Sequence, residues 1–267
     1  MARVIARSVS DVVEQFELDG DIVVTVDRLM SVMGQLGLEG DPRRLAYNLQ
    51  RAGWLGRLRT RHAWEFLPGA RAGAYSSGDR FIEFRAQRAT RPEWPGALAM
   101  ESAASVLGLA QRIPEREVVA LPDDAIFPKA LSREWRYVRV EMPDEGIAEI
   151  DGLPVWGREG LIVGIGLRPS GYKDVAGLGQ WLSASSYEID AEKVIRLLAS
   201  MGAAARQRTA YLLQASGNHT GAQQVVDAYP PMDTAWLGPR QQSGRYDPLT
   251  KVSDTVLNRY LSIGGGS

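Results

Sequence analysis

The chain has 267 residues, 45% of them hydrophobic, and a net charge of −1 at pH 7, so it can form two domains, or one large one, with a sizeable core. It contains no cysteine, which excludes disulfides, thiolate zinc sites and cysteine nucleophiles. It shows neither the apolar core of a signal peptide nor a run long enough to span a bilayer, and we therefore expect a cytoplasmic protein with no membrane partner.

The first forty residues contain the elements that usually precede a DNA-recognition helix. Apolar residues at 12–16 predict a short helix, and the β-branched run at 22–26 is typical of a strand. Residues 27–36 predict a second amphipathic helix, and the glycine-rich segment 37–40 fits the turn of a helix-turn-helix.

Residues 41–53 predict a short helix with a basic outer face. Asp41 can cap its first turn, Pro42 suits the first helical position, and Gly53 is placed to end it. Leu45, Leu49 and Ala52 fall on one apolar face. The other face and its edge carry side chains that can pair with base edges or phosphates, namely Arg43, Arg44, Tyr47, Asn48, Gln50 and Arg51. The alternative is a surface helix whose charges are only solvated.

An arginine-rich hairpin is predicted directly after this helix, over residues 54–67. Its apolar positions have near period-2 spacing, and Arg57, Arg59 and Arg61 lie on or near the turn. In a winged helix-turn-helix, such a wing places arginines beside the phosphate backbone or in the minor groove. The alternative is an edge hairpin whose charge prevents aggregation.

Positive charge is concentrated in this part of the chain. Residues 42–91 contain eleven arginines and three acidic side chains, a net charge of +8, whereas residues 92–267 contain 17 basic and 21 acidic side chains. Arginines outnumber lysines by 27 to 4. High-GC codon usage explains much of that ratio, but it does not explain the concentration of charge, which is typical of a polyanion-binding segment.

We place a domain boundary near residue 90, with a winged-helix DNA-binding domain at 1–90 and a larger α+β domain at 91–267. Residues 80–85 fit a strand of either domain. In the second domain we predict helices over residues 97–109, 190–201, 207–213 and 253–261. Strands are predicted over residues 117–121, 136–141 and 161–165. The elements do not alternate as in a βαβ fold, which leaves the mixed class α+β.

The sequence gives only weak matches to catalytic motifs. The glycines at 164, 166 and 171 fit neither a Rossmann fingerprint nor a P-loop, and we interpret them as a turn. The two histidines, His62 and His219, are too far apart in sequence to suggest a metal site, so we expect no metal and no cofactor. Acidic residues with a nearby lysine suggest either a nuclease cluster or the first turn of a helix: Glu188, Asp190, Glu192 and Lys193.

The order of several motifs resembles the AbiEi family of antitoxins, in particular its larger mycobacterial-type members. The run at 49–55 with the basic wing is similar to the winged helix of that family. Similar motifs follow in the second half of the chain, at 102–109, 160–163, 168–170, 206–213, 236–240 and 251–256.

The resemblance implies a function. AbiEi proteins are antitoxins encoded beside a nucleotidyltransferase-like toxin, and they repress their own operon by binding DNA upstream of it. In these type IV systems the antitoxin need not contact the toxin. The N-terminal domain serves DNA binding and the C-terminal domain serves antitoxicity. In this family, positive charge on the C-terminal domain often contributes to DNA contact, whereas the C-terminal half of this chain is net acidic.

Our first hypothesis is therefore a non-enzymatic DNA-binding repressor and antitoxin, with duplex DNA as its partner. A homodimer on an inverted repeat is a further expectation, although no coiled-coil segment supports it. The alternatives are a metal-dependent nuclease or nucleotide-modifying enzyme recruited to DNA by the winged helix, with Asp190 and Glu192 as first candidates, and a winged-helix module that binds proteins.

Overall fold

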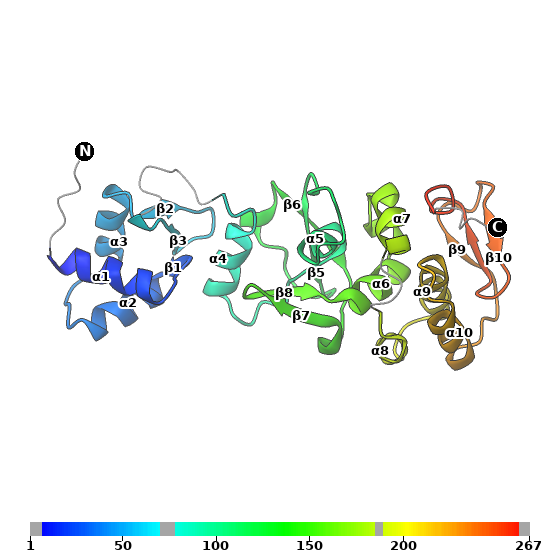
Figure 1. Ribbon diagram of the computed structural model, residues 1–267. Helices are drawn as coiled ribbons and strands as arrows, with labels where there is room; N and C mark the ends of the chain where they lie inside the picture. The colour runs from blue at the N-terminus through cyan, green and yellow to red at the C-terminus, as the bar shows by residue number, and fades with distance from the viewer. Residues whose placement is uncertain (1–6, 70–77, 185–188, 262–267) are drawn as a thin grey trace. The chain divides into compact units, whose positions relative to one another are not determined.

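The computed structural model describes residues 7–69, 78–184 and 189–261, which form two units. The first comprises Met1–Trp94 with Pro128–Arg133, and the second Pro95–Phe127 with Glu134–Ser267. Figure 1 gives the order of the elements along the chain. No helix in the described part of the chain is both long and apolar enough to cross a bilayer.

The first unit has the topology of a winged helix-turn-helix, as the sequence predicts. Its helices are α1 (Arg7–Leu18), α2 (Val26–Gln35), α3 (Pro42–Arg51) and α4 (Ile82–Thr90). Its strands are β1 (Val23–Thr25), β2 (Leu55–Arg57) and β3 (Ala63–Phe66), which form an antiparallel sheet in the order β1-β3-β2. The hairpin of β2 and β3 is the wing.

Local sequence signals set the ends of α2 and α3. The Thr25 hydroxyl accepts from the backbone N–H of Arg28, and the Asp41 carboxylate accepts from that of Arg43. Each side chain therefore satisfies one of the N–H groups that a helix leaves without a partner at its start. After α3, Gly53 takes a φ of 79°, which lets the chain reverse direction into the wing.

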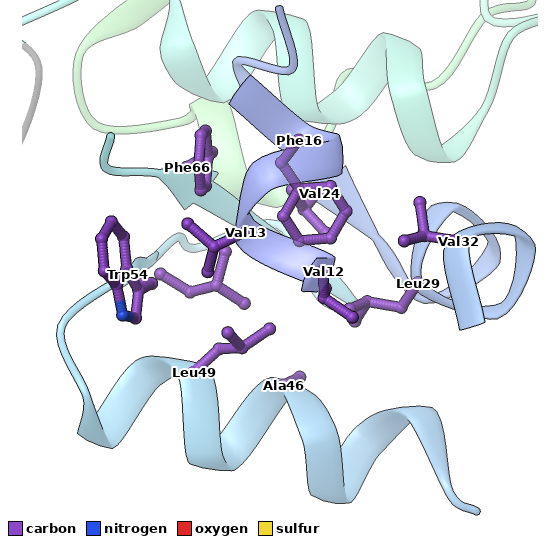
Figure 2. Packing of buried hydrophobic residues seen from close by; sticks show 11 residues of the cluster. Val12, Val13, Phe16, Val24, Leu29, Val32, Ala46, Leu49, Trp54 and Phe66 are labelled. Atoms are coloured by element: carbon purple, nitrogen blue, oxygen red, sulfur yellow. The ribbon is translucent and has the colours of Figure 1, made fainter. Parts of the chain in front are cut away.

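One apolar core holds these elements together (Figure 2). Phe16 of α1 meets Phe66 of β3 edge to face, with ring centroids 5.4 Å apart. Leu49 of α3 is fully buried in the same core. Burial of a side chain of this size stabilises a fold by about 1.5–3 kcal/mol. The core fixes the rotation of α3 and leaves its opposite face to solvent.

The structure differs from one prediction in this unit. Residues 80–85 fit a strand in the sequence, but most of them belong to helix α4. The Asp79 carboxylate accepts from the backbone N–H of Phe81 and from the guanidinium of Arg85, at 2.8 Å each, which supports a helical turn. Phe81 and Phe84 lie three residues apart, and both are buried. The segment is too short for its period to distinguish a helix from a strand.

The second unit is built on a mixed five-stranded sheet with the order β6-β5-β4-β8-β7. Its strands are β4 (Ala97–Leu98), β5 (Glu117–Leu121), β6 (Trp135–Arg139), β7 (Ile147–Ile150) and β8 (Leu153–Trp156). Strands β5 and β6 run parallel, as do β4 and β8, and the other neighbours are antiparallel. The α+β class is therefore confirmed.

Helices follow the sheet, and a small second sheet closes the unit. The helices are α5 (Met100–Val106), α6 (Arg158–Leu167), α7 (Val175–Ala184), α8 (Ala191–Leu197), α9 (Ala203–Ala215) and α10 (His219–Ala228). Short 3-10 turns lie at η2 (Lys129–Leu131), η3 (Asp144–Gly146) and η4 (Pro169–Gly171), of which η2 belongs to the first unit. The small sheet has the order β10-β11-β9, from β9 (Ala235–Leu237), β10 (Arg245–Asp247) and β11 (Val252–Asp254).

The structure corrects the sequence predictions at several places in this unit. Residues 161–165 lie inside helix α6 and not in a strand, and the glycines at 164 and 166 belong to that helix and not to a turn. The start of the predicted helix 253–261 is strand β11, which pairs with β9. Residues 97 and 98 form a strand before α5, and helix α8 ends at Leu197, four residues earlier than predicted.

Candidate nucleic-acid interface

Helix α3 turns the predicted contact residues to solvent. Ala46 and Leu49 are fully buried beneath it. The side chains of Arg43, Arg44, Tyr47, Asn48 and Arg51 are exposed, and Gln50 is partly buried. The structure therefore brings the five exposed residues together on one helix, with Gln50 at the margin.

The cations of α3 have no carboxylate partner in the described part of the chain. Within residues 7–69, 78–184 and 189–261, no ion pair joins Arg43, Arg44 or Arg51 to an acidic side chain. The guanidinium of Arg51 lies 5.8 Å from the centre of the Tyr47 ring, a cation–π distance. Guanidinium groups without a carboxylate partner remain able to bind phosphates or guanine edges.

The wing carries the other three predicted residues. Arg57 is the last residue of β2, while Arg59 and Arg61 lie in the turn before β3, and all three side chains are exposed. Strand β2 contacts α3, so the wing and the helix are neighbours in the same unit. His62 adopts a φ of 64° in this turn, a conformation that few residues other than glycine take.

Glu83 of α4 holds the turn of the wing from behind. One of its carboxylate oxygens accepts from the backbone N–H of Arg59 at 2.6 Å. The other accepts from the backbone N–H of Thr60 at 3.1 Å and from the Thr60 hydroxyl at 3.0 Å. Both Glu83 and Thr60 are buried. The sequence analysis did not identify Glu83 as a functional residue. An acidic side chain beside the apolar positions of a helix is the signal that could have indicated it.

Arg28, in contrast, has a structural role. Its guanidinium pairs with Asp21 at 2.8 Å and also with Asp19. The hydrogen bond to Asp21 is the main cause that raises the pKa of Arg28. Hydrogen bonds from Gln15 and Arg28 lower the pKa of Asp19. This arginine of α2 is already paired with carboxylates, whereas no ion pair is formed by the arginines of α3 among the described residues.

Two of the residues that suggested a nuclease, Asp190 and Lys193, have structural partners. The Asp190 carboxylate caps α8 by accepting from the backbone N–H groups of Glu192 and Lys193, at 2.9 and 3.3 Å. The Lys193 ammonium pairs with Glu159 at 3.1 Å. Glu188 lies outside the described residues. Among the residues that the structure describes, no group of three or more histidine or acidic side chains is arranged to hold a metal ion.

Comparison with known proteins identifies a family for a large part of the second unit. Residues 96–215 match the family model of the AbiEi antitoxin C-terminal domain. The chain carries an AbiEi antitoxin domain. This confirms the resemblance found in the sequence and supports an antitoxin of a toxin–antitoxin system. The AbiEi domain begins just before β4 and ends with α9, so the winged helix lies outside the matched segment.

A solved structure extends the similarity to the rest of the chain. The RV2827C protein from Mycobacterium tuberculosis shares 26% sequence identity with the chain, at a TM-score of 0.78. The similarity covers 97% of this chain and 95% of that one, so it includes the N-terminal unit that the family match leaves out. Among curated proteins, none matches the chain.

Proposed function

We propose that the chain is a sequence-specific DNA-binding repressor of its own operon and the antitoxin of a type IV toxin–antitoxin system. The observation that carries the DNA-binding part is the exposed outer face of α3, where Arg43, Arg44 and Arg51 have no carboxylate partner among the described residues. The family match of residues 96–215 supports the antitoxin part.

Helix α3 and the wing would contact different parts of the DNA. Helix α3 has the dimensions that fit the major groove, where Arg pairs with guanine and Asn or Gln with adenine. The wing would contact phosphates or the minor groove through Arg57, Arg59 and Arg61. Phosphate contacts fix the orientation of the protein, and base contacts select the operator.

The toxin partner would be a nucleotidyltransferase-like protein. In this proposal, repression limits toxin synthesis and the AbiEi domain supplies antitoxicity without an obligatory complex between the two proteins. A second copy of the chain on an inverted repeat would double the contacts, with half-sites about one helical turn, roughly 34 Å, apart.

Footprinting of the DNA upstream of the chain's own gene tests the proposal. At physiological salt, we expect a protected site whose affinity exceeds that for unrelated duplex by about 10³-fold or more. The Arg43→Ala/Arg44→Ala double variant should lose that protection, whereas Arg91→Ala, a change at an exposed arginine outside the interface, should keep it.

Two results would contradict the proposal. Equal affinity for operator and unrelated DNA would remove sequence-specific repression. No binding to any duplex, together with salt-insensitive binding to a protein, would favour the winged helix as a protein-interaction module.

A further inference from the structure

A cavity in the AbiEi domain is lined by four cationic side chains. It has a volume of about 320 Å³, within the range of small-molecule sites. The cations on its wall are Arg112, Arg116, Arg136 and Lys173. Arg112 and Arg116 belong to the segment that precedes β5, Arg136 to β6, and Lys173 to the segment that precedes α7. Ala110, Ile113 and Pro114 add apolar surface to the same wall.

Two of these cations have no acidic partner among the residues that the structure describes. Arg112 and Lys173 are exposed, and no carboxylate within the described residues forms an ion pair with either side chain. Arg116 donates a hydrogen bond to the backbone carbonyl of Trp135, which holds its guanidinium on the wall. Arg136 pairs with Glu101, which is buried beside it.

The carboxylates of the cavity are largely occupied. Glu101 accepts from the Arg136 guanidinium and from the backbone N–H groups of Lys173 and Asp174. Asp174 accepts from the backbone N–H of Gly177 at 3.0 Å, at the start of α7. Glu115 also lines the cavity and is exposed. The wall therefore presents more donors than acceptors to a molecule that enters it.

Electrostatics around Arg136 favour an additional anion. Burial is the main cause that lowers the pKa of Arg136; Glu101 opposes this shift and the neighbouring Arg116 adds to it. Two guanidinium groups that repel each other at a partly buried site are stabilised when a negative charge binds between them.

The backbone just before Glu101, one of the lining residues, is strained. Met100, which precedes Glu101, has a φ of 50° although it is not a glycine, and its side chain is fully buried. Such strain clusters at binding sites, where the surrounding structure holds a side chain in place.

We infer that this cavity binds a nucleotide, with the phosphate groups held by Arg112, Arg116, Arg136 and Lys173 and the base against the apolar wall formed by Ala110, Ile113 and Pro114. Arginine suits the phosphate groups, because its planar fork pairs with phosphate oxygens. A free nucleotide and the phosphorylated end of an RNA strand share this chemistry. The inference is independent of the DNA interface on the first unit.

Calorimetric titration of the full chain with ATP, without DNA, tests the inference. Adenosine and inorganic phosphate serve as partial ligands, and we expect both to bind more weakly than ATP. A short single-stranded RNA, with and without a 5′ phosphate, distinguishes the two sources. Tighter binding of ATP than of the phosphorylated RNA supports a free nucleotide, and the reverse order supports a strand end.

Matched variants locate the binding site. Arg112→Ala and Lys173→Ala should each weaken ATP binding about tenfold, because each removes a charged hydrogen-bond donor. Arg240→Ala, at another exposed arginine of the second unit, and the Arg43→Ala/Arg44→Ala double variant should bind ATP as the unmodified chain does.

Thermal unfolding in 5 mM ATP, at the same salt, provides an independent measurement. The inference predicts a higher Tm for the unmodified chain and a smaller shift for Arg112→Ala/Lys173→Ala. The absence of both heat and a Tm shift would overturn it. Binding that survives this double change, but is lost in Arg43→Ala/Arg44→Ala, would also overturn it, because the ligand would then lie on the DNA interface.

Discussion

Glu83 and Thr60 are 23 residues apart in the chain, yet the buried carboxylate of Glu83 accepts both the backbone N–H and the hydroxyl proton of Thr60. A third hydrogen bond, from the backbone N–H of Arg59, completes this link between α4 and the wing. The turn that carries the arginines is therefore held by a side chain that is buried behind it.

Removal of this link should loosen the wing. We expect Glu83→Ala to lower the free energy of unfolding by about 1.5–3 kcal/mol, because buried N–H groups lose a charged acceptor. Glu83→Gln keeps the shape but replaces one acceptor oxygen with a donor, and it should also destabilise. Urea unfolding measures both effects.

The matched control for Glu83 is Glu93→Ala, which changes an exposed acidic residue of the same unit and should leave stability within about 0.5 kcal/mol. At a temperature where the Glu83 variants remain folded, their affinity for DNA should fall on all sequences alike. Unchanged stability and unchanged affinity in Glu83→Ala would show that the hydrogen bonds do not position the wing.

Helix α3 should carry the sequence preference. If Arg43 or Arg44 pairs with a base, its replacement by alanine should cost about 1–3 kcal/mol on the operator and much less on unrelated duplex. Mobility shifts with both DNAs measure this difference. Arg91→Ala provides the control. An equal loss on both DNAs would assign the residue to phosphate contact instead.

The wing should contribute mainly electrostatic affinity. Log affinity falls as log salt rises. Replacing an arginine that contacts a phosphate, among Arg57, Arg59 and Arg61, should make this slope less steep by about 1. The triple alanine variant should therefore bind every duplex more weakly and with a flatter salt dependence. Unchanged mobility shifts for the triple variant would remove the wing from the interface.

The sequence predicted the first unit well because its signals are local. Asp41 and Gly53 mark the ends of one helix, and the hairpin that follows has period-2 apolar positions. These features act over a few residues and need no knowledge of the rest of the fold. The position of Glu83 behind the wing depends on tertiary packing, which no local pattern contains.

Buried polar groups explain the failure near the C-terminus. Residues 253–261 have apolar positions at helical spacing, yet Asp254 is fully buried and accepts from the Tyr211 hydroxyl at 2.7 Å. It also accepts from the backbone N–H groups of Val256 and Leu257, which forms a local turn in competition with a helix. Strand β11 also pairs with β9, which comes earlier in the chain, so the start of this segment is a strand and not a helix.

Helix α6 was predicted as a strand because it is apolar on nearly all sides. Residues 159 to 166 are buried, so the helical period of polar and apolar positions is absent. The glycines that suggested a turn instead permit close packing. A Cβ at Gly164 would lie 2.2 Å from the ring of the fully buried Trp156, and one at Gly166 would lie 2.3 Å from the Thr209 hydroxyl.

This packing predicts that Gly164→Ala destabilises the AbiEi domain. The ring of Trp156 cannot move without displacing the core around it, and we expect a loss of about 1–3 kcal/mol in the free energy of unfolding. Gly34→Ala in α2 is the control, because a Cβ at that position would meet nothing within 4 Å apart from the adjacent residues and the backbone of its own helix. There, alanine should stabilise by about 0.4–1 kcal/mol through a less flexible unfolded chain. Urea unfolding of both variants, followed by circular dichroism, measures the contrast, and equal stability of Gly164→Ala and the unmodified chain would contradict the close approach of α6 to Trp156.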